Sequence, residues 1–571
     1  MNLRKCQTGL PLTSVCEKTV VVKQIYTQCE QVKTAYSFCY LSPMQFIQGS
    51  SRHQTYFSTL DDQVETDNPV RLIDAFTDKL DLEKLGFTNT VHKSEGRPAY
   101  APVVLLKLYL YGYLNKIRSS RKLANECCRN TELQWLLEQL HPNYHTIADF
   151  RKQHAQPLQS MFKLYVQFLS EAGLLGKTTI AVDGSKFKAV NSRKNNYNQK
   201  KIDKHRQFIE DKTAKYLQEL DELDKQENTN DDSLGIKKEK IAQGLAKLKE
   251  RTIKYDTLQQ QLDDTTDKQI STTDADSRSI IIVKNIVEVA YNLQNAVDDK
   301  HNLIVYTQAT NTNDGKALHT AATQAKQNLQ LQKEDTLMLL ADKGYHTGAE
   351  LHGCQQENMI THVAYKEQPS VKHIANEFLS ESFSYDKLTD TYTCPAGALL
   401  SSLGTWHNKK GEASETSYRF KTYRTGACKT CPLKKQCTKL PKRIIHRSEY
   451  QDAVDINDNN IKQNPQYYKR RQAICEHPFG SIKRHWGYTH TLLKGLQKVN
   501  GEMNLIMLCY NFLRTKNILG FEKMLEAIKI WTPDYSKVAG AFKNAVMQMI
   551  YRQNRRLYFL STNKMLFLQS I

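Results

Sequence analysis

The sequence predicts an α/β protein with a mixed five-stranded sheet at its core and an all-α domain before it. Apolar residues recur at helical spacing as far as residue 171, and from Leu174 onward their period changes to two. Strand-like and helix-like segments then alternate up to residue 365. The chain has 571 residues, a length that suits roughly three or four domains or lobes.

The charge balance predicts a polyanionic partner, most simply nucleic acid. Lys and Arg total 80 against 60 Asp and Glu, which leaves a net charge of +20. A basic soluble protein without such a partner is the alternative. We find no apolar run near the roughly 18 residues of a spanning helix and no apolar signal core, so we expect a cytoplasmic protein with no membrane partner. The 13 cysteines are then expected to be thiols or metal ligands.

The all-helical domain is predicted over residues 44–172. Asp67 or Asn68 caps an early helix, and Thr146 caps a later basic helix that contains Arg151. Several short helices that end in a basic one are compatible with a helix-turn-helix-like DNA-binding unit, and a small helical packing domain has the same pattern.

The two ends of the chain fit this scheme poorly. Residues 1–43 show no clear amphipathic period. We expect either a poorly ordered arm or an overrun upstream of a true start at Met44. Residues 532–571 form a basic tail for which the pattern predicts no fold.

Seven core elements follow in the order strand, strand, strand, helix, strand, helix, strand. Their predicted bounds are 178–184, 287–298, 301–310, 315–330, 336–345, 347–357 and 359–365. The first and fourth strands both end at an aspartate, Asp183 and Asp342. This is the connectivity of a ribonuclease-H-like fold, in which those two strands lie side by side and ligands bind beyond the strand ends. The core then spans 173–197 and 271–366, and helices over 460–531 complete it.

Two insertions interrupt this core. Residues 198–263 have apolar residues spaced by three, four or seven, which predicts a helical hairpin of the coiled-coil kind, and a charged, partly disordered linker is the alternative. The second insertion, residues 370–455, contains a CxxC pair and two further cysteines. The four are Cys394, Cys428, Cys431 and Cys437. This is a zinc-site pattern, so we expect either structural Zn²⁺ or free thiols.

The two strand-end carboxylates predict a divalent cation. A carboxylate at the end of a buried strand is costly unless it is paired or metal-bound, and two in adjacent strands repel each other. Mg²⁺ (or Mn²⁺) removes that conflict, and two such cations can activate a water or a 3′-hydroxyl. Taken singly, Asp183 or Asp342 can equally be a turn former.

Glu476 is the only acidic residue in the basic segment YYKRRQAICEHPFGSIKRHWGY, residues 467–488. It shares a helical face with Lys483, seven residues later. Pro478 removes a helical hydrogen bond, so we expect a kink or a helix start near residues 475–477. Two distant aspartates that converge on Glu476 would form one site.

With these motifs, the chain resembles a bacterial insertion-sequence transposase of the DDE class. The similar segments are LLKLYLYGYLNKIRSSRKL with HTIADFRKQH, VDGSKFKAVNS, DADSRS with VAYNLQNAVD, ADKGYHTG, and EHPFGSIKRHWGY followed by LLKGLQKVNGEMNLIMLCYNFLR. The likeness covers roughly residues 44–515. It departs from related families at Gln472, where they have an arginine, which leaves that role open between Arg470 and Arg471.

The resemblance implies Asp183, Asp342 and Glu476 as the catalytic, metal-binding triad, with Mg²⁺ or Mn²⁺ as cofactor. It implies hydrolysis at the ends of the element, followed by strand transfer of the freed 3′-hydroxyl to target DNA. The implied partners are double-stranded DNA with terminal inverted repeats and further copies of the chain in the DNA complex. A nuclease without strand transfer and a catalytically dead, transposase-derived DNA-binding protein are the alternatives.

Six basic residues near these motifs are expected to contact DNA, and each contact would steepen the salt dependence of binding. They are Lys186, Lys188, Arg471, Lys483, Arg484 and Arg151. For any one of them, a solvated basic face is the alternative.

Overall fold

The structure of the protein is a computed structural model that describes residues 53–55, 57–90, 98–225, 232–265, 268–283, 286–365, 374–409 and 418–536. The chain divides into two compact units, Met1–Thr59 and Leu60–Ile571, and the elements below belong to the second. The predicted arm over 1–43, and the tail beyond residue 536, lie outside the described residues. Within the described part, no helix combines the length and apolarity needed to cross a membrane.

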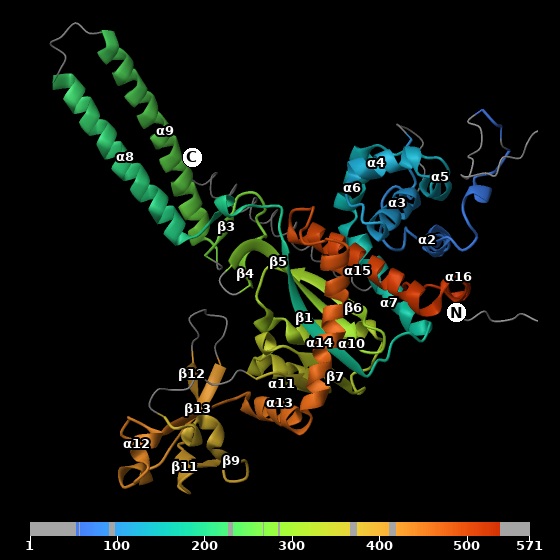
Figure 1. Ribbon diagram of the computed structural model, residues 1–571. Coiled ribbons are helices and arrows are strands. Elements are labelled where there is room, and N and C mark those ends of the chain that lie inside the picture. The colour runs from blue at the N-terminus through green and yellow to red at the C-terminus, as the bar shows by residue number, and fades with distance from the viewer. Residues whose placement is uncertain are drawn as a thin grey trace, which may run out of the picture. The chain divides into compact units, whose positions relative to one another are not determined.

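The N-terminal part of this unit is all-helical (Figure 1). Its described helices are Pro69–Asp78 (α2), Pro102–Leu114 (α3), Ser120–Arg129 (α4), Thr131–Leu136 (α5), Tyr144–Gln153 (α6) and Ala155–Glu171 (α7). Asn68 caps α2, since its side chain accepts a hydrogen bond from the Val70 amide at 3.0 Å. Helix α6 begins before Thr146, and Asn143 is its cap instead of Thr146, accepting from the Thr146 amide at 2.9 Å.

A mixed, curled, six-stranded sheet follows. Its strands are Thr179–Lys188 (β1), Arg278–Val283 (β4), Ile286–Asp298 (β5), Leu303–Thr310 (β6), Leu337–Ala341 (β7) and Met359–Val363 (β8). Their order is β4-β5-β1-β7-β8, with β6 also paired to β5. The predicted first and fourth strands, β1 and β7, are parallel neighbours. The sheet has one strand more than the five predicted, because β4 pairs along the first part of β5. Strand β4 was not predicted because its run of three isoleucines lacks the alternation of apolar and polar residues that marks a half-buried strand.

Helices pack on this sheet after and between its strands. They are Leu318–Asn328 (α10), Gly348–Gln356 (α11), Gln451–Gln463 (α13), Pro465–Gly480 (α14) and Leu496–Leu519 (α15). The last described helix, Phe521–Ile530 (α16), packs on α15 and α2. Asn511 of α15 accepts from the Ile304 amide of β6 at 2.9 Å and donates to the Ile304 carbonyl at 2.7 Å. Asn457 of α13 makes the same pair of bonds with Val363 of β8, both at 2.8 Å. These amides take the place of a neighbouring strand along β6 and β8.

Two antiparallel helices occupy the segment predicted as a helical hairpin, Gln199–Lys225 (α8) and Asp232–Asp263 (α9). They run side by side in Figure 1. Ile202 and Ile209 of α8 pack with Leu248 and Tyr255 of α9 in a small apolar cluster. A short strand pair, Asn196–Tyr197 (β2) and Ile270–Ser271 (β3), closes the base of the hairpin.

The cysteine-bearing insertion has a sheet of its own, which the sequence pattern did not predict because its strands are short. They are Ser384–Asp386 (β9), Thr391–Thr393 (β10), Leu399–Ser402 (β11), His407–Lys409 (β12), Tyr418–Arg424 (β13) and Ile444–Ser448 (β14). Their order is β12-β13-β11-β10-β9, with β14 on β13, and the pairs are antiparallel. Tyr392, Leu400 and Tyr423 form its small apolar core.

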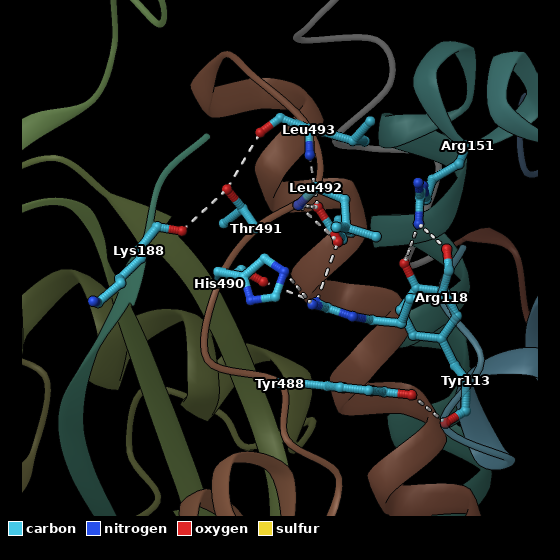
Figure 2. Close-up of polar contacts among 10 residues, drawn as sticks. Tyr113, Arg118, Arg151, Lys188, Tyr488, His490, Thr491, Leu492 and Leu493 are labelled. Atoms are coloured by element: carbon cyan, nitrogen blue, oxygen red, sulfur yellow. Dashed lines mark hydrogen bonds and ion pairs between the residues drawn. The ribbon is translucent and has the colours of Figure 1, made fainter. Parts of the chain in front are cut away.

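A polar network joins the helical region to strand β1 through the loop that precedes α15 (Figure 2). His490 pairs with Lys188 in a parallel bridge, and the Thr491 amide donates to the Lys188 carbonyl at 2.8 Å. Arg118 donates to the His490 carbonyl at 2.9 Å and lies 3.6 Å from the carboxylate of Glu502 on α15. Glu502 is fully buried and also accepts bonds from the amides of the two loop residues that follow Thr491. One buried ion pair therefore joins the helical region to α15, and main-chain bonds of the preceding loop extend this network to β1.

Candidate active site

Asp183 and Asp342 come together where the parallel pairing of β1 and β7 stops. The last paired residues are Val182 and Ala341, and the two aspartates are the next residues along their strands. Strand β1 continues along β5 as far as Lys188, so Asp183 lies within a strand and not at its end as predicted. The convergence itself agrees with the prediction, because it depends on β1 and β7 being neighbours.

The carboxyl group of Asp183 is held in an electrostatically unfavourable position. Burial raises its pKa, and the charges of Asp342 and Asp314 raise it further. Two groups oppose this shift: Arg471, whose Nη1 lies 3.6 Å from Oδ2 of Asp183, and the Gly184 amide, which donates to Oδ1 at 2.9 Å. The pKa stays raised, so a bound cation would stabilise the ionised form.

Arg471, and not Arg470, faces the aspartates. The guanidinium of Arg470 instead pairs with Asp299 at 2.6 Å. Burial lowers the pKa of Arg471, but the charge of Asp183 raises it and leaves the net pKa above its usual range. Of the two candidates for the role of the arginine missing at Gln472, Arg471 is therefore the one that lies near Asp183.

Glu476 lies on an adjoining face of α14. Its side chain is exposed and accepts a hydrogen bond from Gln472 Nε2 at 2.8 Å. The residue before it, Cys475, is buried, and its thiol pKa is raised by burial and by the charge of Asp183. Over the described part of the chain, no group of three or more His, Cys, Asp or Glu side chains is set to hold a metal ion. The structure brings Asp183 and Asp342 together and does not join Glu476 to them in such a group.

We expected a kink or a helix start near residues 475–477 because of Pro478. The helix does not start there. Helix α14 runs without interruption from Pro465 to Gly480, and Asn464 caps it. The irregularity comes later, as a π-helical turn over Ser481–His485, closed by a bond from the Trp486 amide to the Ser481 carbonyl at 3.0 Å. Proline has no backbone N–H, so Pro478 removes one helical hydrogen bond, and α14 continues past it. The wider π-helical turn begins three residues later, at Ser481.

The sequence analysis missed Asp314, which follows β6 and lies among the residues around both aspartates. Its Oδ1 accepts from Asn292 at 2.7 Å and Gln294 at 2.8 Å, and its Oδ2 pairs with Lys186 at 2.9 Å. Burial alone would raise the pKa of Asp314, but the Lys186 charge and these hydrogen bonds lower it. The missed signal was a third acidic residue after a core strand, in the run NTNDG.

The lysines predicted to bind DNA have partners within the protein. Lys186 pairs with Asp314, and Lys188 lies 3.6 Å from Glu288. Lys483 donates to the Lys186 carbonyl at 2.8 Å, and its ammonium sits over the Phe187 ring. Burial, aided by repulsion from Lys186, lowers the pKa of Lys483 to about 8.

Arg151 and Arg484 differ sharply in exposure. Arg484 is exposed, as a DNA contact requires. Arg151 is only 6% exposed and donates to the Tyr113 hydroxyl at 2.7 Å and to the Arg118 carbonyl at 3.2 Å. This burial argues against the predicted DNA contact, because the guanidinium fixes the interior of the helical region. The sequence did contain a sign of this, because Arg151 lies four residues after Ile147 and so shares the apolar face of α6 with Phe150.

The four cysteines of the insertion line one small cavity of about 40 Å³. Burial raises the pKa of Cys437, and the charges of the other three cysteines add to this effect. His446 is a histidine that could substitute for one cysteine as a ligand. It lies on β14 and does not line this cavity, and its ring is 3.4 Å from the Thr422 hydroxyl. The four thiols therefore lie around one cavity, although within the described part of the chain they are not arranged as a group that holds a metal ion.

Comparison with known families gives two matches. Residues 58–153 match the family described as transposase domain (DUF772), and residues 393–515 match the family described as transposase DDE domain. Together they indicate an insertion-sequence DDE transposase. We found no match among curated proteins and none among solved structures.

The matches divide the site unevenly. The DDE transposase domain includes the cysteine cluster, Glu476 and most of α15, and the other domain includes α2 to α6. Asp183 and Asp342 lie outside both matched regions. A DDE transposase domain implies an enzyme that modifies nucleic acid, and hence DNA as a partner and divalent cations as the usual cofactor.

Proposed function

We propose that this protein cuts phosphodiester bonds at the ends of an insertion element and joins the freed 3′-hydroxyls to target DNA. The observation that carries the proposal is the juxtaposition of Asp183 and Asp342 beyond the last paired residues of β1 and β7, with α14 packed beside them. The strand order β6-β5-β1-β7-β8 supports a ribonuclease-H-like core, in which ligands bind at this end of the central strands.

The residues of the site fit a divalent cation. Asp183 has a raised pKa beside a second carboxylate, and this unfavourable arrangement is relieved when a cation is bound. Asp183, Asp342 and Glu476 would hold Mg²⁺ or Mn²⁺. Cations at such a site supply a Lewis acid that activates a water or a 3′-hydroxyl and stabilises the leaving oxygen.

The protein's own side chains have separate tasks in this proposal. Asp183 and Asp342 are fixed by the sheet, whereas Glu476 is exposed on α14 and is free to turn toward them once its bond to Gln472 opens. Arg471 places a permanent positive charge next to Asp183, where it can contact a phosphate. Lys483, Lys188 and Arg484 extend this basic surface along the DNA backbone.

The substrate follows from the same proposal. Joining requires both ends of the element, marked by terminal inverted repeats, and two ends require at least two active sites in one complex. We therefore infer that copies of the chain assemble on DNA.

The test uses the full-length protein with duplexes taken from the two ends of the element that carries the gene. We expect Mg²⁺-dependent nicking at the ends and joining to a target plasmid, both lost in Asp183→Asn and Glu476→Gln. Asp335→Asn is the matched control, because Asp335 is an exposed carboxylate that accepts from the Gln332 amide of its own turn at 2.7 Å. Nicking without joining would identify a nuclease, and binding without nicking would identify a DNA-binding protein. Either result contradicts the proposal.

We also infer that Cys394, Cys428, Cys431 and Cys437 bind a structural Zn²⁺. Four sulfur ligands suit Zn²⁺, and these four thiols share one cavity within a small sheet that has few core residues of its own. Elemental analysis of the purified protein should find about one zinc per chain, and Cys431→Ser should lose it. The exposed Cys128→Ser should keep it. A parent protein that contains no zinc contradicts the inference.

A further inference from the structure

Asp314 occupies the point where three segments of the site meet. It opens the short helical turn Asp314–Lys316 after β6, which packs against the turn Lys343–Tyr345 that follows Asp342. A Cβ atom built on Gly184 would lie 2.4 Å from Oδ1 of Asp314, and one built on Gly344 would lie 3.6 Å from the Asp314 Cβ. The carboxylate thus sits between the residue after Asp183 and a residue just after Asp342, and glycine at position 184 is required for this approach.

The hydrogen bonds of Asp314 reach both aspartate-bearing segments. Its Oδ2 forms an ion pair with the ammonium of Lys186, three residues after Asp183. Its Oδ1 accepts from Nε2 of Gln294, and the side-chain Oε1 of Gln294 accepts from the hydroxyl of Tyr345, three residues after Asp342. Gln294 and Tyr345 are almost fully buried, so the bond between them is shielded from water.

We propose that Asp314 is a positioning residue of the cation site, which fixes the segments after Asp183 and Asp342 relative to each other and neutralises Lys186 beside them. The inference rests on the proposed cation site. If Asp314 lost its charge, the Lys186 ammonium would be unpaired close to Lys483, and the added positive charge would oppose a cation. The Gln294–Tyr345 link would also lose its anchor.

The test measures Mn²⁺ binding to the full-length protein by calorimetry, without DNA. Asp314→Asn is expected to weaken binding about tenfold or more, the usual effect of losing a group that orients metal ligands. Tyr345→Phe removes only one hydroxyl and should weaken binding by a smaller factor. Asp335→Asn should bind as the parent does. Melting temperatures of all variants show whether each one folds.

A double-mutant cycle separates positioning from general destabilisation. Because Asp314 acts in part through Lys186, Asp314→Asn and Lys186→Met should not be additive in Mn²⁺ affinity. Unchanged affinity in folded Asp314→Asn overturns the inference, and so does unchanged affinity in Tyr345→Phe if Asp314→Asn does not fold. Additive effects overturn the Lys186 part of it. If Asp183→Asn also binds Mn²⁺ as the parent does, the proposed function fails instead.

Discussion

The guanidinium of Arg471 lies 3.6 Å from the carboxylate of Asp183, across the gap between α14 and β1. This is a loose pairing, longer than a charge-assisted hydrogen bond, and it leaves the pKa of Asp183 raised. Arg471 therefore lowers the pKa of Asp183 only in part, because the net shift stays upward. Under the proposed function, Arg471 would both limit cation binding and provide a charge for DNA, and the two effects can be separated by experiment.

Mn²⁺ affinity is expected to fall at acidic pH as Asp183 is protonated, and we call this part of the pH profile the acidic limb. Replacing Arg471 by Met is expected to move the acidic limb to higher pH. The reason is that Arg471 lowers the pKa of Asp183, so that its loss makes ionisation of this ligand harder. At pH above that limb, binding should be no weaker than in the parent, because a nearby positive charge has been removed. Calorimetric titrations between pH 5 and pH 8 check this, with Arg470→Met as control. A limb that stays in place would show that Arg471 has no influence on Asp183.

Asp183→Asn should stabilise the metal-free protein at neutral pH. A carboxyl group whose pKa is raised on folding binds more protons in the folded state, so stability is lost as pH rises from 3.8 through the raised value. An asparagine lacks this penalty. We expect a gain of about 0.5–2 kcal/mol, the common range for one stabilising substitution. Denaturant melts at pH 7 in EDTA measure it, and Mg²⁺ should then stabilise the parent but not the variant. A less stable Asp183→Asn protein would contradict the proposed strain.

DNA binding by Lys483 should depend on pH above neutrality. Its pKa is lowered to about 8 by burial, so the ammonium loses its proton as pH rises through this value. If it contacts a phosphate, the slope of log affinity against log salt should become shallower by about 0.9 between pH 7 and pH 9.5. Lys483→Arg stays charged and should keep the steeper slope at both pH values. Equal slopes in the parent protein would exclude Lys483 from the phosphate contacts.

Arg118→Met is expected to destabilise the protein by about 3–5 kcal/mol, because it leaves the buried carboxylate of Glu502 unpaired. The double variant with Glu502→Gln should recover part of the loss. Arg121→Met is a matched control, since Arg121 is exposed and stacks on the Tyr144 ring. Midpoints of chemical unfolding provide the comparison. A loss below about 1 kcal/mol, the level of an exposed ion pair, would show that the pair is solvated.

Local patterns were sufficient to predict the central strands β1 and β7 and the positions of Asp183 and Asp342 along them. The runs before Asp183 and Asp342 are apolar and β-branched or leucine-rich, so their type can be read from a few neighbouring residues. The position of Asp314 at this site could not be predicted from local patterns, because its partners Lys186 and Gln294 come from two other strands. Its role depends on register, which no local pattern contains.

The helix near Glu476 shows the same limit. Pro478 led to the prediction of a kink or a helix start near residues 475–477, whereas α14 continues to Gly480 and the wide turn comes after it. Arg151 was placed on the surface by its charge, whereas the Tyr113 hydroxyl and the Arg118 carbonyl hold it inside. Burial of a basic side chain is a property of its surroundings.

Two helical asparagines that bond to β6 and β8 bear on how copies of this chain can associate. Asn511 and Asn457 use the main-chain groups of Ile304 and Val363 that an incoming strand would need. Continuous sheets across two protomers are therefore disfavoured along β6 and β8. Strand β4 differs, since Ile281 is 60% exposed on it. If copies of the chain assemble on DNA as proposed, we expect their contacts to come from helices, from loops or from β4. Such a complex could then form and come apart without rearranging the pairing along β6 and β8.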